Sequence, residues 1–300
     1  MKVPMFFIQT CPVPVLNSRT IPHASFTMQT TLSIIGSGHV ARTLGRLWHC
    51  HGAVELHDLL SRTAANAKTA CDFIGGGRPL DDYAGLAPAN IYLIATPDDQ
   101  IAACCARLVA SGLVRPGVVV FHCSGALPAA VLASAAACGA YTASIHPVRS
   151  FASPEQVAKS FAGTWCGVEG DEAALAVLRP LFIDIGAKLV AIDPTAKTVY
   201  HAAAVFACNY LVTLLDIAVQ AYAHAGIPEE VAMQMMAPLV QKTVDQAFAA
   251  GTAAALSGPI ARGDMGTVER QQAAVSAWDG DKGALYALLA KETVALARRK

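Results

Sequence analysis

The stretch SIIGSGHVA, which begins at Ser33, constrains the fold of this chain more than any other. Residues 31–35 have the apolar pattern of a short buried strand, and Gly36, Gly38 and Ala41 follow in the spacing G-x-G-x-x-A. In a strand–turn–helix unit, the first glycine permits a tight turn and the second leaves room for a phosphate near the backbone. The third small residue lets the helix approach the strand closely.

The helix that follows this turn is expected to bind an anion. Its first N–H groups and its dipole favour a pyrophosphate. The predicted phosphate-binding residues are Gly36, Ser37, Gly38, His39 and Val40. Gly45 lies one helical turn after Ala41 and would keep the same helix face close to the sheet. The pattern therefore predicts a dinucleotide-binding domain, with an ordinary glycine-rich turn before a helix as the alternative.

Residues 53–60 predict a second strand, which ends at Ser61-Arg62-Thr63. In dinucleotide-binding folds an acidic residue about 20 positions past the fingerprint commonly bonds the ribose 2′-hydroxyl. Here that neighbourhood carries two hydroxyls and a guanidinium, whose donors match the oxygens of a 2′-phosphate. The pattern favours NADP(H) over NAD. Asp58, earlier in the strand, is a competing ribose ligand, and a solvated loop arginine is the alternative for Arg62.

Strands and helices alternate up to about residue 193, which is typical of a doubly wound α/β sheet. Ala95, Thr96 and Pro97 end one continuous apolar run and are expected to border the cofactor, because ligands bind at the carboxyl ends of such strands. Asp98 and Asp99 are expected to cap the next helix. The further strands are expected at residues 90–95, 117–122, 140–145, 165–168 and 188–192.

After residue 193 the apolar pattern becomes helical. Residues 195–225 predict one long helix, residues 229–248 a second with a possible break at Pro238, and residues 267–278 and 282–297 two more. The predicted fold is thus a Rossmann-like α/β domain over residues 30–193, followed by an all-helical domain over residues 194–300. Residues 1–29 show no clear period and are expected to lie outside the fold, with Met28 as a possible native start.

The composition favours a large folded core and argues against a strongly charged partner. The chain has 300 residues, of which 54% are hydrophobic and 15% charged, and its formal net charge is zero. This length suits two domains without long disordered segments, and no basic field is present to attract nucleic acid. Nine scattered cysteines without a C-x-x-C pair indicate reduced intracellular thiols, not disulfides.

Two further patterns suggest a membrane span and a metal site, and each is better explained otherwise. Residues 198–215 carry no formal charge and have about the length of a membrane span. Polar residues interrupt this run, so we expect a buried helix of a soluble, cytoplasmic protein without a membrane partner. His49, Cys50, His51 and His57 match no zinc-binding spacing, so no metal site is expected.

Ser124 and His146 lie at the ends of neighbouring predicted strands, on the side where ligands bind. Ser124 is a candidate donor to a substrate carboxylate or carboxamide, and His146 is a candidate acid–base group. For both, the alternative is a structural role. Arg149 and Arg262 are candidates for binding an anionic group of the substrate. The alternative for Arg262 is a surface ion pair with Asp264.

Lys197 and His201 are four residues apart in the long predicted helix and therefore share a face. A histidine titrates near neutral pH, which suits a general acid, and Lys197 would orient a carboxylate or share the proton. The alternatives are a capping lysine and an interior histidine that is hydrogen-bonded. Asn209, eight residues past His201 and close to the same face, would bond the substrate or a neighbouring helix.

Several motifs together resemble those of bacterial proteins in which a Rossmann-like NADP-binding domain is fused to a helical domain of unknown function. The chain is more distantly similar to pyrroline-carboxylate reductase, ketopantoate reductase and the hydroxyacid dehydrogenases. In hydroxyacid dehydrogenases a Lys and an Asn at the spacing of Lys197 and His201 face the nicotinamide, and His201 departs from that pattern. The matching stretches are residues 122–127, 144–151, 163–170, 200–203, 209–210 and 258–264.

The resemblance implies a dehydrogenase-like architecture, often with a dimer built from the helical domain, and supplies no substrate. We therefore expect an NADP-dependent oxidoreductase that reduces a small carbonyl or imine substrate. The alternatives are an NADP-binding sensor or scaffold without turnover and a reductase that uses a deazaflavin. A homodimer is expected because the apolar residues of the run 198–215 surround most of the helix. The loop 258–264 would then reach the partner's cleft.

Overall fold

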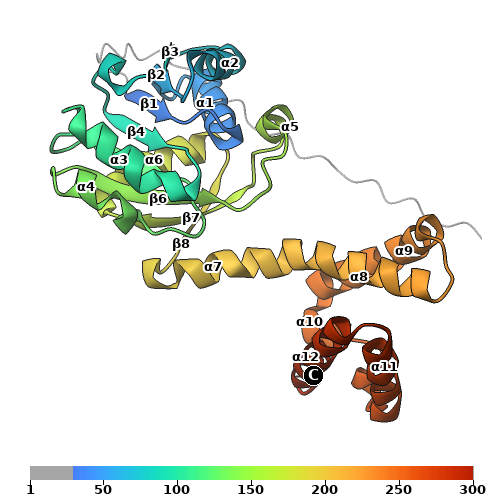
Figure 1. Ribbon diagram of the computed structural model, residues 1–300. Helices are drawn as coiled ribbons and strands as arrows, with labels where there is room; N and C mark the ends of the chain where they lie inside the picture. The colour runs from blue at the N-terminus through green and yellow to red at the C-terminus, as the bar shows by residue number, and fades with distance from the viewer. Residues whose placement is uncertain (1–29, 300) are drawn as a thin grey trace, which may run out of the picture. The chain divides into compact units, whose positions relative to one another are not determined.

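The computed structural model describes residues 30–299 (Figure 1). The expectations for residues 1–29, including Met28 as a native start, lie outside these described residues. The chain divides into two compact units, the first ending at Pro194 and the second beginning at Thr195.

The first unit is built on one eight-stranded sheet with the strand order β3-β2-β1-β4-β5-β6-β7-β8. Neighbouring strands are parallel, except that β6 and β7 are antiparallel. All the strands that the sequence predicts are present, and the short strand β3 is an addition. The strands are β1 Thr31–Ile35, β2 Glu55–Leu60, β3 Arg78–Leu80, β4 Ile91–Ile94, β5 Val119–His122, β6 Tyr141–Pro147, β7 Trp165–Gly170 and β8 Lys188–Ala191.

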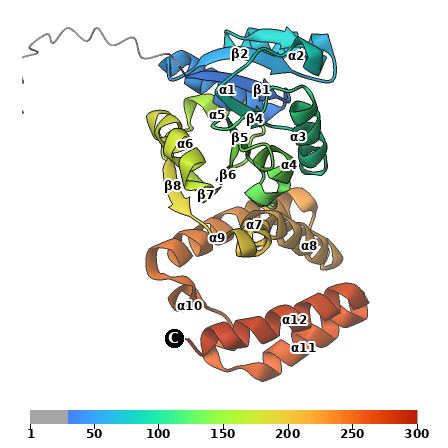
Figure 2. The ribbon, with the colours of Figure 1, turned by 90° about the vertical axis from the view of Figure 1, so that its left-hand side faces the viewer.

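Helices cover both faces of this sheet, as its continuous apolar strands predict. On one face α1, α2 and α6 surround Trp48, Phe121 and Phe182, whose rings meet edge to face. On the other face α3 and α4 pack over Tyr92 and Leu132, so that α3 and α6 lie on opposite sides (Figure 2). The helices are α1 His39–His51, α2 Ala64–Ile74, α3 Ile101–Ala110, α4 Ala133–Ala136, α5 Pro154–Lys159 and α6 Glu172–Asp184.

The second unit is helical in all its regular elements. The long predicted helix is present, but a five-residue π-helical turn, η5 Val205–Asn209, separates its two halves. The next helix runs through Pro238 without a break. The helices are α7 Lys197–Ala204, α8 Tyr210–His224, α9 Glu229–Ala250, α10 Thr252–Ala255, α11 Met265–Trp278 and α12 Gly280–Ala297.

The apolar run on α7 and α8 is exposed within the second unit. Within the described residues, one helical segment, Pro194–His224, is long and apolar enough to cross a membrane by length and composition alone, and none of its most apolar window is buried. Val199 is 73% exposed and Phe206 is 69% exposed. The other helices of the second unit therefore do not cover these side chains.

Candidate functional site

The glycine turn connects the carboxyl ends of three neighbouring strands. The N–H of Gly36 donates to the carbonyl of Leu60 at the end of β2, at 2.8 Å. Gly36 has a φ of +116°, and a Cβ built there would lie 2.3 Å from the carbonyl oxygen of Ala95, just after β4. Only glycine fits this position, because both the backbone angle and the close approach exclude a side chain.

The next glycine, Gly38, has open space where Gly36 has none. A Cβ built on Gly38 meets no atom within 4 Å, and Gly38 is the residue before α1. The first turn of α1 carries no acidic side chain, so its positive end is left for an anion. A tight turn and an open helix start fit a dinucleotide pyrophosphate.

The other predicted residues of this turn are held by nearby groups. His39 Nδ1 lies 2.5 Å from the carbonyl oxygen of Phe151, in the loop that follows β6. Val40 packs against the apolar cluster beneath α1. Gly45 is buried as predicted, since a Cβ there would lie 2.7 Å from Ile74 Cδ1. These contacts fix the first turn of α1 in place.

The residues proposed for the ribose end lie after β2, where Ser61 contacts the glycine turn. Ser37 Oγ and Ser61 Oγ are 2.8 Å apart. Thr63 caps α2 by accepting the N–H of Asn66 at 3.2 Å, and Arg62 between them is exposed. Two hydroxyls and a guanidinium thus occupy the position where an acidic residue would bond a ribose 2′-hydroxyl.

Asp58, the competing ribose ligand, is already committed to a structural role. Its side chain is buried, and its carboxylate accepts Arg78 Nε at 2.8 Å and the N–H of Ala87 at 2.7 Å. The hydrogen bond to Asp58 and its charge raise the pKa of the Arg78 guanidinium further above its usual range. The structure therefore overturns the alternative in which Asp58 reads the ribose.

Ser124 forms a hydrogen bond with Asp98, a residue that was expected to cap a helix. Its Oγ donates to Asp98 Oδ2 at 2.7 Å and accepts the N–H groups of Ala126 and Leu127 at 3.2 and 3.0 Å. Asp98 was expected to cap a helix, but its side chain joins the loop after β4 to the loop after β5 instead. The proton of Ser124 is engaged, so donation to a substrate would require the bond to Asp98 to break.

Buried polar side chains support the same loop from beneath. His122 Nδ1 accepts the N–H of Ser124 at 3.1 Å, which leaves the ring proton on Nε2, 3.3 Å from the carbonyl oxygen of Pro128. Glu169 on β7 accepts the N–H of Ala129 at 2.8 Å. His146 is half-buried on β6. The sequence pattern did not single out His122 or Glu169, because their roles depend on strands that meet only in the fold.

Arg149, the candidate for binding an anionic group, is already engaged in hydrogen bonds within the protein, as Ser124 is. One terminal nitrogen donates to the carbonyl oxygen of Ser160 at 2.8 Å and to Thr164 Oγ1 at 3.2 Å, and the other donates to Ser160 Oγ at 3.0 Å. These bonds brace the end of α5 against the loop after β6. An anion would have to compete with them for the guanidinium.

The remaining candidates belong to the second unit. Lys197 is the first residue of α7 and is buried, His201 is half-buried one turn later, and Asn209 is exposed at the end of η5. Arg262 is exposed in a short 3₁₀ turn. Asp264 caps α11 by accepting the N–H of Thr267 at 3.1 Å, and hydrogen bonds from Thr267 lower the pKa of its carboxyl.

The structure thus gathers the predicted residues into two sets. The fingerprint turn, Ser61 to Thr63, Ala95 to Pro97 and Ser124 lie at the carboxyl edge of the sheet in the first unit, and Lys197, His201 and Asn209 lie on one helical run of the second. Among residues 30–299, no group of three or more His, Cys, Asp or Glu side chains is placed to hold a metal ion.

The strand order, the glycine turn and the group formed by Ser37, Ser61 and Arg62 define a dinucleotide-binding domain of the Rossmann type. A helical domain follows it. Two family models match the chain, and they follow one another in the order of these two domains. A Rossmann-like domain matches residues 22–147, and a domain of unknown function, DUF2520, matches residues 164–293. The chain therefore combines these two domains, which confirms the resemblance seen in its motifs.

Solved structures share this two-domain fold over most of its length. A protein from Thermotoga maritima is 25% identical with a TM-score of 0.72, covering 89% of this chain and 98% of its own. A protein from Bacteroides fragilis, for which an NADP oxidoreductase activity has been suggested, is 21% identical with a TM-score of 0.68, covering 89% and 98%. An imine reductase from Myxococcus stipitatus, in complex with NADP⁺, is 16% identical with a TM-score of 0.58, covering 90% and 93%.

A pyrroline-5-carboxylate reductase also shares the fold. Oxidoreductases therefore predominate among these structural neighbours, and at such identities the likeness establishes the fold. Among curated proteins, none matches the chain significantly.

Proposed function

We propose that this protein is an NADP-dependent oxidoreductase that reduces a small carbonyl or imine substrate by hydride transfer. The observation that carries the proposal is the ribose end of the site. Ser37 and Ser61 present paired hydroxyls beside Arg62, while the nearby carboxylate of Asp58 is buried and bonded elsewhere. A 2′-phosphate would meet donors there without a negative charge in contact with it.

Each part of the site has a defined task in this proposal. The turn from Gly36 to Val40 binds the pyrophosphate, the residues from Ser61 to Thr63 bind the 2′-phosphate, and those from Ala95 to Pro97 border the nicotinamide. The dihydronicotinamide supplies the hydride when it is bound. Lys197 orients the substrate, and His201 donates a proton to the oxygen or nitrogen that the reduction leaves negative.

The cofactor assignment is tested by calorimetric titration of the purified full-length chain with NADPH and with NADH. The account predicts that NADPH binds at least about tenfold more tightly, because only NADPH makes a charged hydrogen bond to Arg62. Equal affinities, or tighter binding of NADH, would contradict it.

The solved structures that resemble this chain over most of its length favour a soluble protein over one that spans a membrane, and we place it in the cytoplasm. We also propose a homodimer built through the helical domain. Within the described part of that domain, the buried apolar side chains are Ala232, Met236 and Val268. A helical domain with so small a core needs further cover for its apolar faces.

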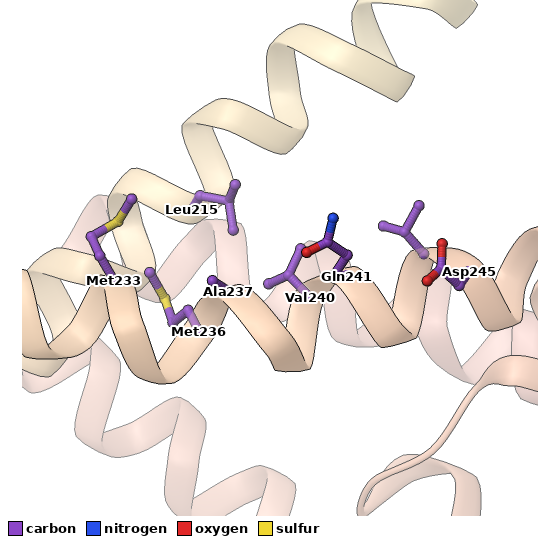
Figure 3. Close-up of a pocket in the computed structure, with 8 residues that line it drawn as sticks. Leu215, Met233, Met236, Ala237, Val240, Gln241 and Asp245 are labelled. Carbon is purple, nitrogen blue, oxygen red and sulfur yellow. The ribbon is translucent and has the colours of Figure 1, made fainter.

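The apolar surface of the second unit fits another copy of the same chain. Leu215 on α8 and side chains of α9 line a groove of about 420 Å³ (Figure 3), next to exposed apolar side chains on both helices. Residues 198–215 carry no charge that would recognise a charged partner, and a twofold dimer brings the same uncharged surface together from both copies. The groove is lined by Leu215, Met233, Met236, Ala237, Val240, Gln241, Val244 and Asp245.

Light scattering at low micromolar concentration tests the dimer. We expect twice the chain mass of 31.2 kDa for the wild type, and a shift to monomer or to aggregates for Phe206→Glu. Ile183→Glu, at an exposed apolar residue of α6 in the first unit, is the control and should leave the dimer intact. A clean wild-type monomer would refute this part of the proposal, including a loop 258–264 that completes the partner's site.

A further inference from the structure

The π-helical turn η5 changes which side chains share a face of the α7–α8 run. In this turn the N–H of Tyr210 bonds the carbonyl of Val205, five residues earlier. A π-turn adds one residue to a helix without adding to the rotation of the flanking segments. Every residue after the turn therefore lies one position, or about 100°, away from where an unbroken α-helix would place it.

This shift brings Asn209 onto the face of the two candidate reaction residues. Measured from Lys197, His201 lies about 40° round the helix, and Asn209 would lie about 120° round an unbroken helix. With the extra residue of η5, Asn209 lies about 20° from Lys197, between the other two.

The distance along the helix limits the kind of molecule that can contact both His201 and Asn209. Eight residues separate them, which corresponds to about 12 Å of helix rise. If both side chains extend at right angles to the helix axis, two hydrogen bonds of about 3 Å each leave about 6 Å to be spanned by the ligand itself. A three-carbon keto acid is too short to bridge the two side chains.

We propose that Asn209 is a substrate-binding residue, and that the substrate carries a second polar group about 6 Å from the oxygen or nitrogen that His201 protonates. This inference rests on the proposed function for the role of His201. Asn209 is exposed, and its amide can donate to a carboxylate or a carbonyl oxygen and accept from an N–H group. The π-turn is the element that keeps this amide in line with Lys197 and His201.

The test compares pyruvate with 2-oxoadipate, a short and a long keto acid, as probes in NADPH oxidation by the full-length protein. Asn209→Ala should raise the KM for 2-oxoadipate about tenfold or more and leave the kinetics with pyruvate unchanged. Gln220→Ala removes an exposed amide further along the same helical run and should change neither. Loss of kcat with both acids would indicate a merely structural role and overturn the inference.

Deletion of Ala207 tests the π-turn itself. A regular helix one residue shorter keeps Asn209 about 20° from Lys197, so the deletion should leave the KM for 2-oxoadipate within about threefold of wild type. Adding Asn209→Ala to the deletion should then raise the KM as it does in the wild-type chain. A deletion that folds but removes the dependence on Asn209 would overturn the role given to the turn.

Binding of 2-oxoadipate to the NADP⁺-loaded protein, measured by calorimetry, separates this inference from the proposed function. Binding that Asn209→Ala weakens supports the inference even if no NADPH is oxidised, in which case the proposed function alone fails. Absence of binding, or binding that Asn209→Ala leaves unchanged, overturns the inference.

Discussion

Replacing Arg62 by alanine removes the group that most separates NADPH from NADH in this site. Arg62 is exposed and follows Ser61, whose Oγ lies 2.8 Å from Ser37 Oγ. A hydrogen bond to a charged group contributes about 1.5–3 kcal/mol, which corresponds to about a 10- to 150-fold change in Kd. Because the side chain is exposed, solvent screening places the expected loss for NADPH in the lower half of that range.

Titration of Arg62→Ala with both cofactors measures this effect. NADH lacks the 2′-phosphate, so its Kd should change by less than about twofold. The difference for NADPH should shrink as salt is added, because salt screens exposed charges. Lys68→Ala is the matched control, since Lys68 is an exposed cation on α2 that pairs with Asp72 at 2.8 Å. An equal loss for both cofactors, or the same loss in Lys68→Ala, would refute the assignment of Arg62.

Three other outcomes follow from the glycine turn and from the buried Cys166 thiol. Gly36→Ala should lower the free energy of unfolding by about 1–3 kcal/mol through backbone strain alone, because a Cβ there lies 2.3 Å from the Ala95 oxygen. Gly38→Ala should leave stability within about 0.5 kcal/mol but weaken NADPH binding, and similar effects of the two changes in urea unfolding would contradict this. Burial raises the pKa of the Cys166 thiol from 9.0 to about 12, so the folded chain keeps a proton that the unfolded chain loses above pH 9. Stability should therefore be unaffected below pH 9 and fall between pH 9 and 12, by about 1.4 kcal/mol at pH 10 from this thiol. Cys166→Ala should show a smaller fall.

Local sequence patterns predicted the strands and the glycine turn of the first unit well, because short stretches of sequence determine these features. The strand from Thr31 to Ile35, the two glycines and the small residues on α1 specify the turn without reference to distant parts of the chain. The antiparallel pairing of β7 was not predicted, since nothing in its own residues indicates strand direction. The three-residue strand β3 is too short to show a period.

The parts of the site that sequence missed depend on contacts between distant segments. Asp98 was expected to cap a helix. The fold brings it close to Ser124, 26 residues away, and its carboxylate accepts a hydrogen bond from the Ser124 hydroxyl instead. From the sequence, Asp58 was available to bind a ribose. In the fold, its carboxylate accepts hydrogen bonds from Arg78 and from the Ala87 N–H. The π-turn before Tyr210 is a single extra residue, and an apolar period cannot reveal it because so many residues of that run are apolar.

The central claim is that this protein reduces a carbonyl or imine substrate with NADPH. Measuring turnover tests it most directly. NADPH oxidation is followed with a panel of small keto acids, aldehydes and cyclic imines, and the reduced product is identified by mass spectrometry. The account predicts at least one substrate that is reduced in equal amount to the NADPH consumed, with a rate about 10²–10⁴-fold lower in His201→Ala. Tight NADPH binding without any reduced product would contradict the account and favour a sensor that does not turn over. A rate that His201→Ala leaves unchanged would remove His201 from the reaction.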